Sequence, residues 1–380
     1  MYQINHTPTS RKQTEARADV IKLGIDIHKK QYVVVRQIDG AAPQSPQRFS
    51  PEGFLSWVSK PREQARRVVS CYEAGCFGFV LHRKLEAMGV ENHVVRPRNW
   101  DDYGAGVKTD ARDARELCNH LDRFVAGNTR ALAPVRVPTE QEERDRSLSR
   151  QRDTLAKERK RLQNIGTSSG RYYGIEVPAQ WWKPKVFEGL KQEVPEFLIE
   201  ILTPYQAVLA VLDHQLRQAT AREECTANRL LPVGLGALTA SVLDREFVDY
   251  GRFTNREAVA SYTGLCPGEA SSGGKRQQGS INKHGNPRVR HMLLEAVWRM
   301  FHFQPDYRPI VQWKERMCRE PFGAAKKKKM AVAIARQFAI DWWRIQTGQM
   351  EPEKVGLKMA LPQAYSVIAM REGRTAKVRA

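Results

Sequence analysis

Runs of apolar, β-branched residues alternate with helical patterns over the first third of the chain, and this order constrains the fold most strongly. The apolar runs predict strands at residues 20–27, 31–36, 47–50, 66–73 and 92–96. Helical patterns follow Pro51 and cover residues 81–88 and 109–121. Because strands that alternate with helices form layered domains, we expect an α/β domain over residues 20–135.

A charged helical sequence replaces this pattern from residue 139. Leucines recur every seven residues in two sets, Leu148, Leu155 and Leu162, then Leu202, Leu209 and Leu216. The two predicted helices either fold on each other as a hairpin or pair with a second subunit. A plain packing face explains the spacing as well as a coiled coil does. We predict a helical, coiled-coil-like spacer or dimerisation region over residues 136–228.

The last third of the sequence is glycine-rich and basic from residue 230, and residues 330–347 predict an amphipathic helix. We expect a mainly α-helical C-terminal domain over residues 229–347, followed by a tail over residues 348–380. Residues 1–19 are polar and lack the apolar core of a secretory signal, so they predict a flexible basic arm.

The charge of the chain indicates its partner. Lys and Arg number 62 against 42 Asp and Glu, a formal net charge of +20, which makes nucleic acid the expected ligand. No run reaches the roughly 18 consecutive apolar residues of a spanning helix, so we expect no membrane association. The 6 cysteines form no CxxC pair, which argues against a disulfide scaffold and a zinc site. We expect a cytoplasmic, nucleoid-associated bacterial protein.

Four carboxylates are predicted to converge at one edge of the N-terminal sheet. Asp26 and Glu73 each end a predicted strand, whereas Asp110 and Asp113 lie three residues apart on one helix face. Such a cluster repels itself unless a hard divalent cation binds, so we expect a Mg²⁺ or Mn²⁺ site. Two such ions assist phosphodiester cleavage. The alternative is structural: Asp110 caps its helix and Asp113 is a favourable acid in the first turn.

The layout of strands, acids and helix resembles the RNase H-like nucleases, which include the resolvase RuvC. Longer segments carry a more specific likeness, namely GIDIHKK (24–30), CYEAG (71–75), KTDARDA (108–114), LPVGLGALTA (231–240), SYTGLCPG (261–268) and SSGGKRQQGSINKHGNPRVRHML (271–293). In these segments the chain resembles the DEDD insertion-sequence transposases of the IS110 family, which include the pilin-inversion recombinase. The resemblance spans most of residues 20–343.

The resemblance implies roles for individual residues. The four acids match the catalytic, metal-binding tetrad of the family's RuvC-like domain. Ser272, which precedes Gly273, matches the serine nucleophile of the family's C-terminal transposase domain, and the neighbouring Ser271 is the alternative. Without the resemblance, residues 271–274 would be interpreted as a flexible turn.

Basic and polar residues follow this serine and are candidates for phosphate contacts: Lys275, Arg276, Lys283, Asn286, Arg288 and Arg290. Arg288 could equally be an ordinary surface residue. Upstream, Gly234 and Gly236 lie in a segment that resembles a helix-hairpin-helix turn, in which glycines let backbone N–H groups approach a phosphate. These eight residues form the predicted nucleic-acid-binding set.

The function that the resemblance implies is transposition: cleavage and exchange of strands between donor and target double-stranded DNA through a serine–DNA link. It further implies a noncoding guide RNA, called a bridge RNA. We also expect a homo-oligomer, either a dimer or a tetramer, because exchange of strands between two duplexes needs several cleavage sites. The acids alone also fit a RuvC-like, structure-selective DNA endonuclease without a covalent intermediate. A non-enzymatic architectural or RNA-binding protein is a further alternative, in which the carboxylates only cap helices.

Overall fold

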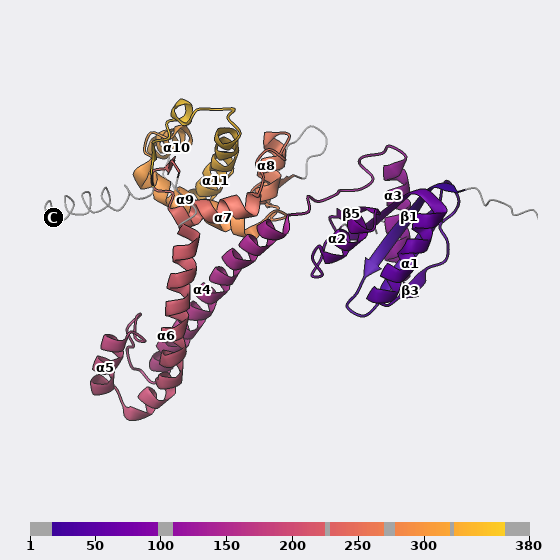
Figure 1. The fold of residues 1–380 in the computed structure, drawn as a ribbon. Coiled ribbons are helices and arrows are strands. Elements are labelled where there is room, and N and C mark those ends of the chain that lie inside the picture. Colours follow the sequence, from indigo (N-terminus) through magenta and orange to yellow (C-terminus); the bar gives the residue numbers. More distant parts are fainter. Residues whose placement is uncertain (1–16, 98–108, 225–228, 270–277, 320–322, 362–380) are drawn as a thin grey trace, which may run out of the picture. The chain divides into compact units, whose positions relative to one another are not determined.

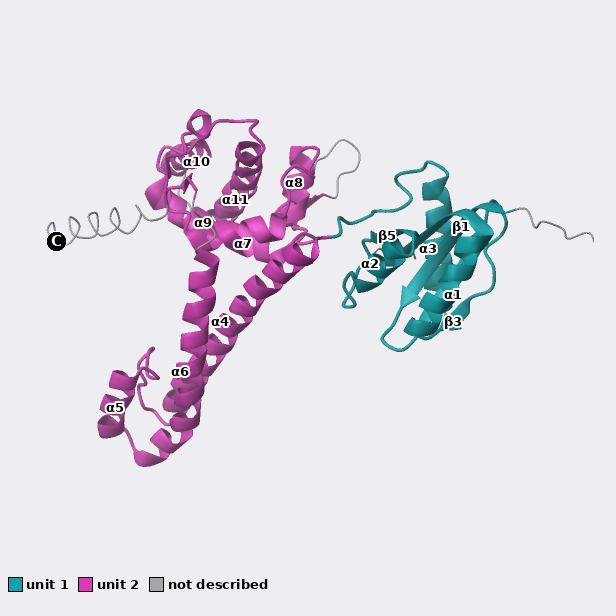
Figure 2. Cartoon of the chain, in the orientation of Figure 1, with its two compact units in different colours: residues 1–137 teal, residues 138–380 magenta. Residues whose placement is uncertain are grey.

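The computed structural model describes residues 17–97, 109–224, 229–269, 278–319 and 323–361. The chain forms two compact units, Met1–Val137 and Pro138–Ala380 (Figure 2). The first is a mixed α/β unit and the second is mainly helical (Figure 1), which confirms the predicted fold class of both parts.

The first unit contains a five-stranded sheet in the order β3-β2-β1-β4-β5. Its strands are β1 (Ala18–Ile27), β2 (Tyr32–Ile38), β3 (Gln47–Phe49), β4 (Ala65–Glu73) and β5 (Glu91–Val95). The first three strands form an antiparallel meander, whereas β4 and β5 run parallel to β1. The predicted strands are all present, and their ends differ from the predicted ends by at most two residues.

Helices cover both faces of this sheet: α1 (Pro51–Gln64), α2 (Val80–Ala87) and α3 (Asp110–Val125). Phe54 of α1 and Leu85 of α2 pack with Ile25 on one face. On the other face, α3 packs Leu117 against Cys71 of β4. Because strand side chains alternate between faces, this division decides which strand-end residues meet α3.

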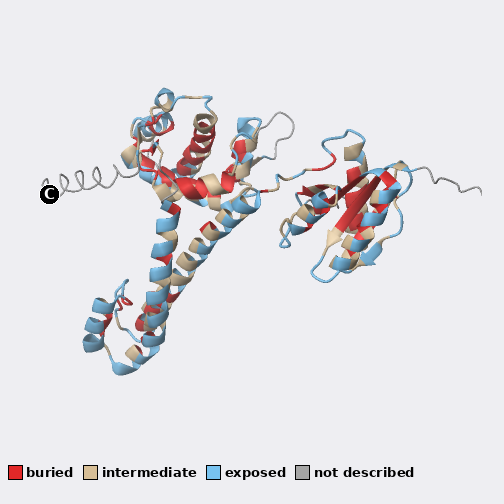
Figure 3. Cartoon of the chain, viewed as in Figure 1, coloured by how far each residue is buried: buried red, intermediate tan, exposed pale blue. Residues whose placement is uncertain are grey.

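The second unit begins with an arm, residues 140–224, built from α4 (Glu140–Tyr172), α5 (Pro184–Glu193) and α6 (Glu196–Glu224). The long helices α4 and α6 pack on each other within one chain, the hairpin of the two predicted arrangements. Arg159 of α4 donates to Asp213 of α6 at 2.8 Å. Figure 3 shows that most of the arm's surface is exposed.

Small residues let the aromatic linker of the arm fold back on α4. Trp181 is fully buried against Gly166, where a Cβ would lie 2.2 Å from the indole ring. The Trp181 indole donates to the Gln163 carbonyl at 3.1 Å. Helix α5 follows this contact and lies in the chain between the two long helices.

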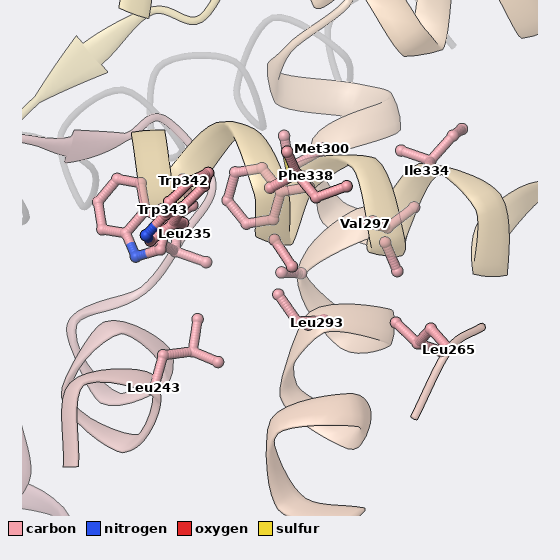
Figure 4. Close-up of a cluster of buried hydrophobic side chains, with 14 of the residues drawn as sticks. Leu235, Leu243, Leu265, Leu293, Val297, Met300, Ile334, Phe338, Trp342 and Trp343 are labelled. Carbon is pink, nitrogen blue, oxygen red and sulfur yellow. The ribbon is translucent and has the colours of Figure 1, made fainter. Parts of the chain in front are cut away.

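Five helices and two short strand pairings complete the described part of the second unit. The helices are α7 (Ala237–Phe247), α8 (Arg256–Thr263), α9 (Pro287–Phe303), α10 (Arg308–Arg319) and α11 (Ala324–Gln346). The described strands are β6 (Leu231–Pro232), β7 (Pro267–Glu269), β8 (Gln278–Ile281) and β9 (Met359–Ala360), which pair β6 with β9 and β7 with β8. Figure 4 shows Phe338 and Trp342 of α11 among the apolar side chains of the core, together with Met300 of α9.

The predicted tail begins too early. The 3₁₀ helix η1 (Pro352–Val355) and strand β9 follow α11, and Leu357 between them is 2% exposed. The side chain of Gln304, the C-cap of α9, accepts a hydrogen bond from the Lys358 backbone N–H at 2.9 Å. This buried contact attaches residues 352–360 to the helical unit.

Among the described residues, α6 is long and apolar enough to cross a membrane by length and composition, with a mean hydropathy of 1.2 over its most apolar window. The sequence criterion of consecutive apolar residues did not reveal it. Length and composition alone are weak evidence, because α6 packs along the charged helix α4.

Candidate functional site

Asp26 and Glu73 lie at the same edge of the N-terminal sheet. Strands β1 and β4 are parallel, and Ile25 pairs with Tyr72, so the two acids follow at adjacent strand ends. Ile25 and Tyr72 pack on the face covered by α1 and α2. By alternation, Asp26 and Glu73 leave their strands on the opposite face, which α3 covers.

Helix α3 brings a third acid, Asp110, to this edge. His28, which directly follows β1, lies there too and was not among the residues predicted from the sequence. His28 Nε2 lies 3.1 Å from Asp26 Oδ2 and 3.4 Å from Asp110 Oδ1. Ligand atoms of these three residues all lie within 4.8 Å of one another. Side chains from the end of β1 and from the start of α3 therefore lie close together.

The electrostatics of Asp26 also show that Asp113 is near. Burial raises the pKa of Asp26 above its ordinary value, and His28 opposes this shift. The carboxylates of Asp110 and Asp113 raise the pKa further by repulsion. Three of the four predicted acids are thus coupled electrostatically, while Glu73 is placed at the same edge by strand register.

This donor set fits a divalent metal ion. Carboxylate oxygens are the ligands that Mg²⁺ and Mn²⁺ prefer, and a cation would relieve the repulsion between Asp26, Asp110 and Asp113. His28 can contribute a ring nitrogen or hold a carboxylate by a hydrogen bond, as histidines around metal sites do. The arrangement can hold a metal ion and, with it, a phosphate.

The sequence contained a signal for His28. It lies two residues after Asp26, and residues two apart along an extended chain point to the same face. His28 falls in the short gap between the predicted strands 20–27 and 31–36, where a turn is expected, and the carboxylates alone were predicted as metal ligands.

Gly24 sets the distance between α3 and the sheet, and its replacement tests how the site is assembled. A Cβ on Gly24 would lie 2.3 Å from the Ala114 carbonyl oxygen and 2.4 Å from the Cys118 amide nitrogen. Because these are helix backbone atoms, Gly24→Ala should displace α3 and lower the free energy of unfolding by about 1–3 kcal/mol. Denaturant titration measures this loss. Gly40→Ala is the control, since nothing lies within 4 Å of its added Cβ; equal stability of the two variants would contradict the prediction.

The predicted nucleophile region lies in the second unit. Ser271, Ser272, Lys275 and Arg276 fall outside the described residues, between β7 and β8. Lys283, just after β8, is exposed and has a φ of 59°, a left-handed conformation. Arg290 donates to the Thr263 carbonyl at 3.3 Å and to the Lys283 carbonyl at 3.4 Å, so it holds the base of the β7–β8 pair.

Arg288 is occupied by protein acceptors. Its side chain is 15% exposed, and its guanidinium donates to Glu246 Oε1 at 2.6 Å and to Asp153 Oδ2 at 2.8 Å. The third guanidinium nitrogen, Nη2, donates to Ser149 Oγ at 3.0 Å. These contacts tie α9 to α4 and α7, so Arg288 has a structural role. A phosphate contact at Arg288 stays a prediction.

Asn286 belongs to the same cluster around the fully buried Glu246. Its side-chain oxygen caps α9, and its amide nitrogen donates to Glu246 Oε2 at 2.8 Å. Burial alone would raise the pKa of Glu246, but hydrogen bonds from Arg150 and Asn286 and the charge of Arg288 hold it below its ordinary value. We call these residues the Glu246 cluster.

The two glycines of the predicted helix-hairpin-helix turn lie between β6 and α7. Gly234 has a φ of 92°, and a Cβ there would lie 2.8 Å from that of Phe303, so close packing accounts for this glycine. Gly236 is the N-cap of α7 and is partly exposed. A phosphate contact at either glycine stays a prediction.

Comparison with known proteins identifies the family. Residues 23–167 match a DEDD model described as a transposase, and residues 232–312 match the model of the transposase IS116/IS110/IS902 family. A putative transposase of Sinorhizobium fredii, y4rJ, is 30% identical over 333 residues, which cover 77% of this chain and 82% of that protein. The chain belongs to the IS116/IS110/IS902 family of transposases.

Other relatives of this IS116/IS110/IS902 family member carry similar names. The transposase for insertion sequence element IS1328 of Yersinia enterocolitica is 24% identical over 289 residues, covering 73% of this chain and 83% of its own length. The transposase for IS1111A of Coxiella burnetii is also 24% identical, over 308 residues, covering 76% and 79%. The family resemblance and the RNase H-like character of the N-terminal domain are thereby confirmed. The two matched ranges contain the four acids and Ser272 respectively.

Proposed function

We propose that this transposase cleaves and exchanges strands of donor and target DNA for an insertion sequence, with Asp26, Glu73, Asp110 and Asp113 as the acids of a metal site. The observation that carries the proposal is the convergence of Asp26, His28 and Asp110 within 4.8 Å at the strand edge. Structural capping alone does not require a strand-end acid and a helix-start acid to share one histidine.

The chain's own residues have distinct tasks in this proposal. The four acids hold Mg²⁺ or Mn²⁺, which when bound polarises the scissile phosphate and stabilises developing negative charge. His28 orients Asp26 and Asp110 through its ring nitrogen, which lies within 3.4 Å of both. Gly24 positions Asp110 by letting α3 approach β1 closely.

Ser272 is the proposed nucleophile. Its hydroxyl oxygen forms a bond to phosphorus and gives up its proton, while the bond from phosphorus to a deoxyribose oxygen breaks and that oxygen leaves as a hydroxyl. The phosphoserine preserves the energy of the phosphodiester, so a different deoxyribose hydroxyl can reverse the step and exchange strands without ATP. Ser271 is the alternative nucleophile.

A noncoding guide RNA is the proposed source of target choice. The net charge of +20 supports this, because a protein that holds RNA–DNA duplexes by their backbones needs broad positive surface. Sequencing of RNA that copurifies with the protein tests it: a discrete RNA with loops complementary to donor and target is expected, and random cellular RNA would refute it. We further propose a homo-oligomer, because exchange between two duplexes needs several cleavage sites.

The proposed chemistry predicts a metal-dependent covalent adduct. When the protein is incubated with donor DNA and Mg²⁺ and then denatured, a DNA-linked band should appear, and EDTA should reduce it by at least about 10²-fold. Restoring Mg²⁺ or Mn²⁺ should return the band. Nicked DNA without any adduct would instead support the RuvC-like endonuclease, which hydrolyses the phosphodiester directly.

A further inference from the structure

A cavity of about 510 Å³ lies in the second unit, lined by α10, α11 and η1, away from β7 and β8 in the sequence. Its size is that of typical ligand pockets. The apolar part of its lining includes the buried Pro309 and Ile334 and the half-buried Trp313. Most of the lining lies beyond residue 312, where the second family match ends, so the comparisons assign the cavity no role.

Three cations line this cavity: Arg308 of α10, Arg344 of α11 and Lys354 of η1. Arg308 and Lys354 are exposed, and Arg344 is partly exposed. Within the described ranges, none of the three side chains has a hydrogen bond or an ion pair. Three cations from separate elements that share one cavity, with no hydrogen bond or ion pair to the described residues, are suited to an anionic ligand.

The acid that lines the cavity does not neutralise these cations by direct pairing. Asp341 is 2% exposed, and its two oxygens accept hydrogen bonds from the Tyr307 hydroxyl at 2.7 Å and the Gln337 amide at 2.8 Å. Burial raises the pKa of Asp341, and the two hydrogen bonds and the charges of Arg344 and Arg308 oppose that shift. The cations of the cavity are therefore exposed or partly exposed, whereas the Asp341 carboxyl is buried and hydrogen-bonded to other protein groups.

Cations beside an aromatic wall are the combination that binds nucleotides. Arg and Lys side chains bind phosphate oxygens, and aromatic side chains stack unpaired bases. A duplex keeps its bases stacked inside and cannot place one in a cavity of this size, whereas a single strand can turn one outward. We propose that this cavity binds one unstacked nucleotide of a single-stranded nucleic acid, with its phosphate on the three cations. Its base takes the place of the exposed Arg316 guanidinium, which lies over the Trp313 ring at 5.0 Å from the ring centroid.

The inference rests on the proposed function only in its choice of a nucleic acid as ligand. RNA and DNA strands share the required chemistry, and the test separates them. Fluorescent single strands of RNA and of DNA with one sequence, and the corresponding duplex, are titrated with the full chain in EDTA. Because no metal is present, the result does not depend on the adduct assay, and either experiment can fail alone.

The test variant is Arg308→Gln/Lys354→Gln, which removes two exposed cations of the cavity. Its matched control is Arg161→Gln/Lys191→Gln, which removes the same charge from exposed positions of the arm. The cavity variant should weaken binding of one or both single strands by about tenfold or more. It should also reduce the slope of the logarithm of the binding constant against the logarithm of the salt concentration by about one. The control and the duplex should change by no more than about twofold. The strand that responds identifies the ligand as RNA or DNA.

Equal losses in the two variants would mean unspecific charge attraction and would overturn the proposal. A loss for the duplex as large as for the single strands would overturn it as well. As a second readout, a strand that carries 5-iodouracil is irradiated with the wild-type chain, and the crosslinked peptide should contain Trp313. No crosslink at Trp313 in the wild type would also contradict the assignment.

Discussion

Asp26→Asn should abolish DNA strand cleavage without unfolding the protein. The Asp26 carboxylate reaches the shared His28 nitrogen at 3.1 Å, so it links the strand edge to Asp110 at the start of α3. Asparagine keeps the shape of the side chain and loses the charge that attracts a divalent cation. Cleavage should fall by at least about 10²-fold, measured as the initial rate of adduct formation in saturating Mg²⁺.

The stability of the same variant distinguishes a functional acid from a structural one. The raised pKa of Asp26 means that the folded protein holds its proton more tightly than the unfolded chain does. The ionised form therefore costs stability at neutral pH, a cost that is relieved as pH falls through the folded-state pKa. The free energy of unfolding of Asp26→Asn should lie within about 0.5 kcal/mol of the wild-type value, or slightly above it.

Asp19→Asn is the control for this variant. Asp19 is 80% exposed and forms a 3.4 Å surface pair with Arg66, so its loss should change neither cleavage nor stability measurably. Cleavage by Asp26→Asn at the wild-type rate would remove Asp26 from the metal site.

Ser272→Ala should eliminate both the covalent adduct and strand exchange. The alanine removes the hydroxyl oxygen of the proposed phosphoserine, so the residual rate should be lower by at least about 10³-fold. DNA binding should persist, because the basic residues of the chain are untouched. Gel electrophoresis under denaturing conditions measures the adduct, and a mobility shift measures binding.

Ser271→Ala is the natural control, since it changes the adjacent serine by the same atom. It should retain the adduct, and peptide mapping of the linked fragment should identify Ser272. If Ser271→Ala loses the adduct instead, the nucleophile is Ser271. Full cleavage by both variants would refute a serine link and favour hydrolysis.

The N-terminal fold could be predicted because its signals are local. β-Branched runs separated by polar turns define the strands of the first unit, and the positions of Asp26 and Glu73 at strand ends follow from those runs. The pairing of β1 with β4 could not be obtained in this way, because register depends on contacts between distant segments. The hairpin of α4 and α6 was one of two arrangements compatible with the leucine spacing.

The C-terminal candidates show which contacts a local sequence pattern leaves out. Asn286 and Arg288 stand in a basic segment, and composition alone favours contact with phosphates. Their actual partner, Glu246, lies about forty positions away and is fully buried, so no local pattern announces it. A buried carboxylate needs charged or polar partners, and it recruits them from whichever helices pack around it.

The Glu246 cluster has a consequence for how parts of this family can be interchanged. The carboxylate on α7 is shared by Arg150 from the arm and Arg288 from α9, and Arg288 also binds Asp153 of the arm. An arm transplanted from a relative would bring its own residues at these positions. A mismatch would leave the buried Glu246 carboxylate without its charged partners. Modular exchange of the arm, in evolution or by engineering, therefore requires that both sides of this junction be inherited together.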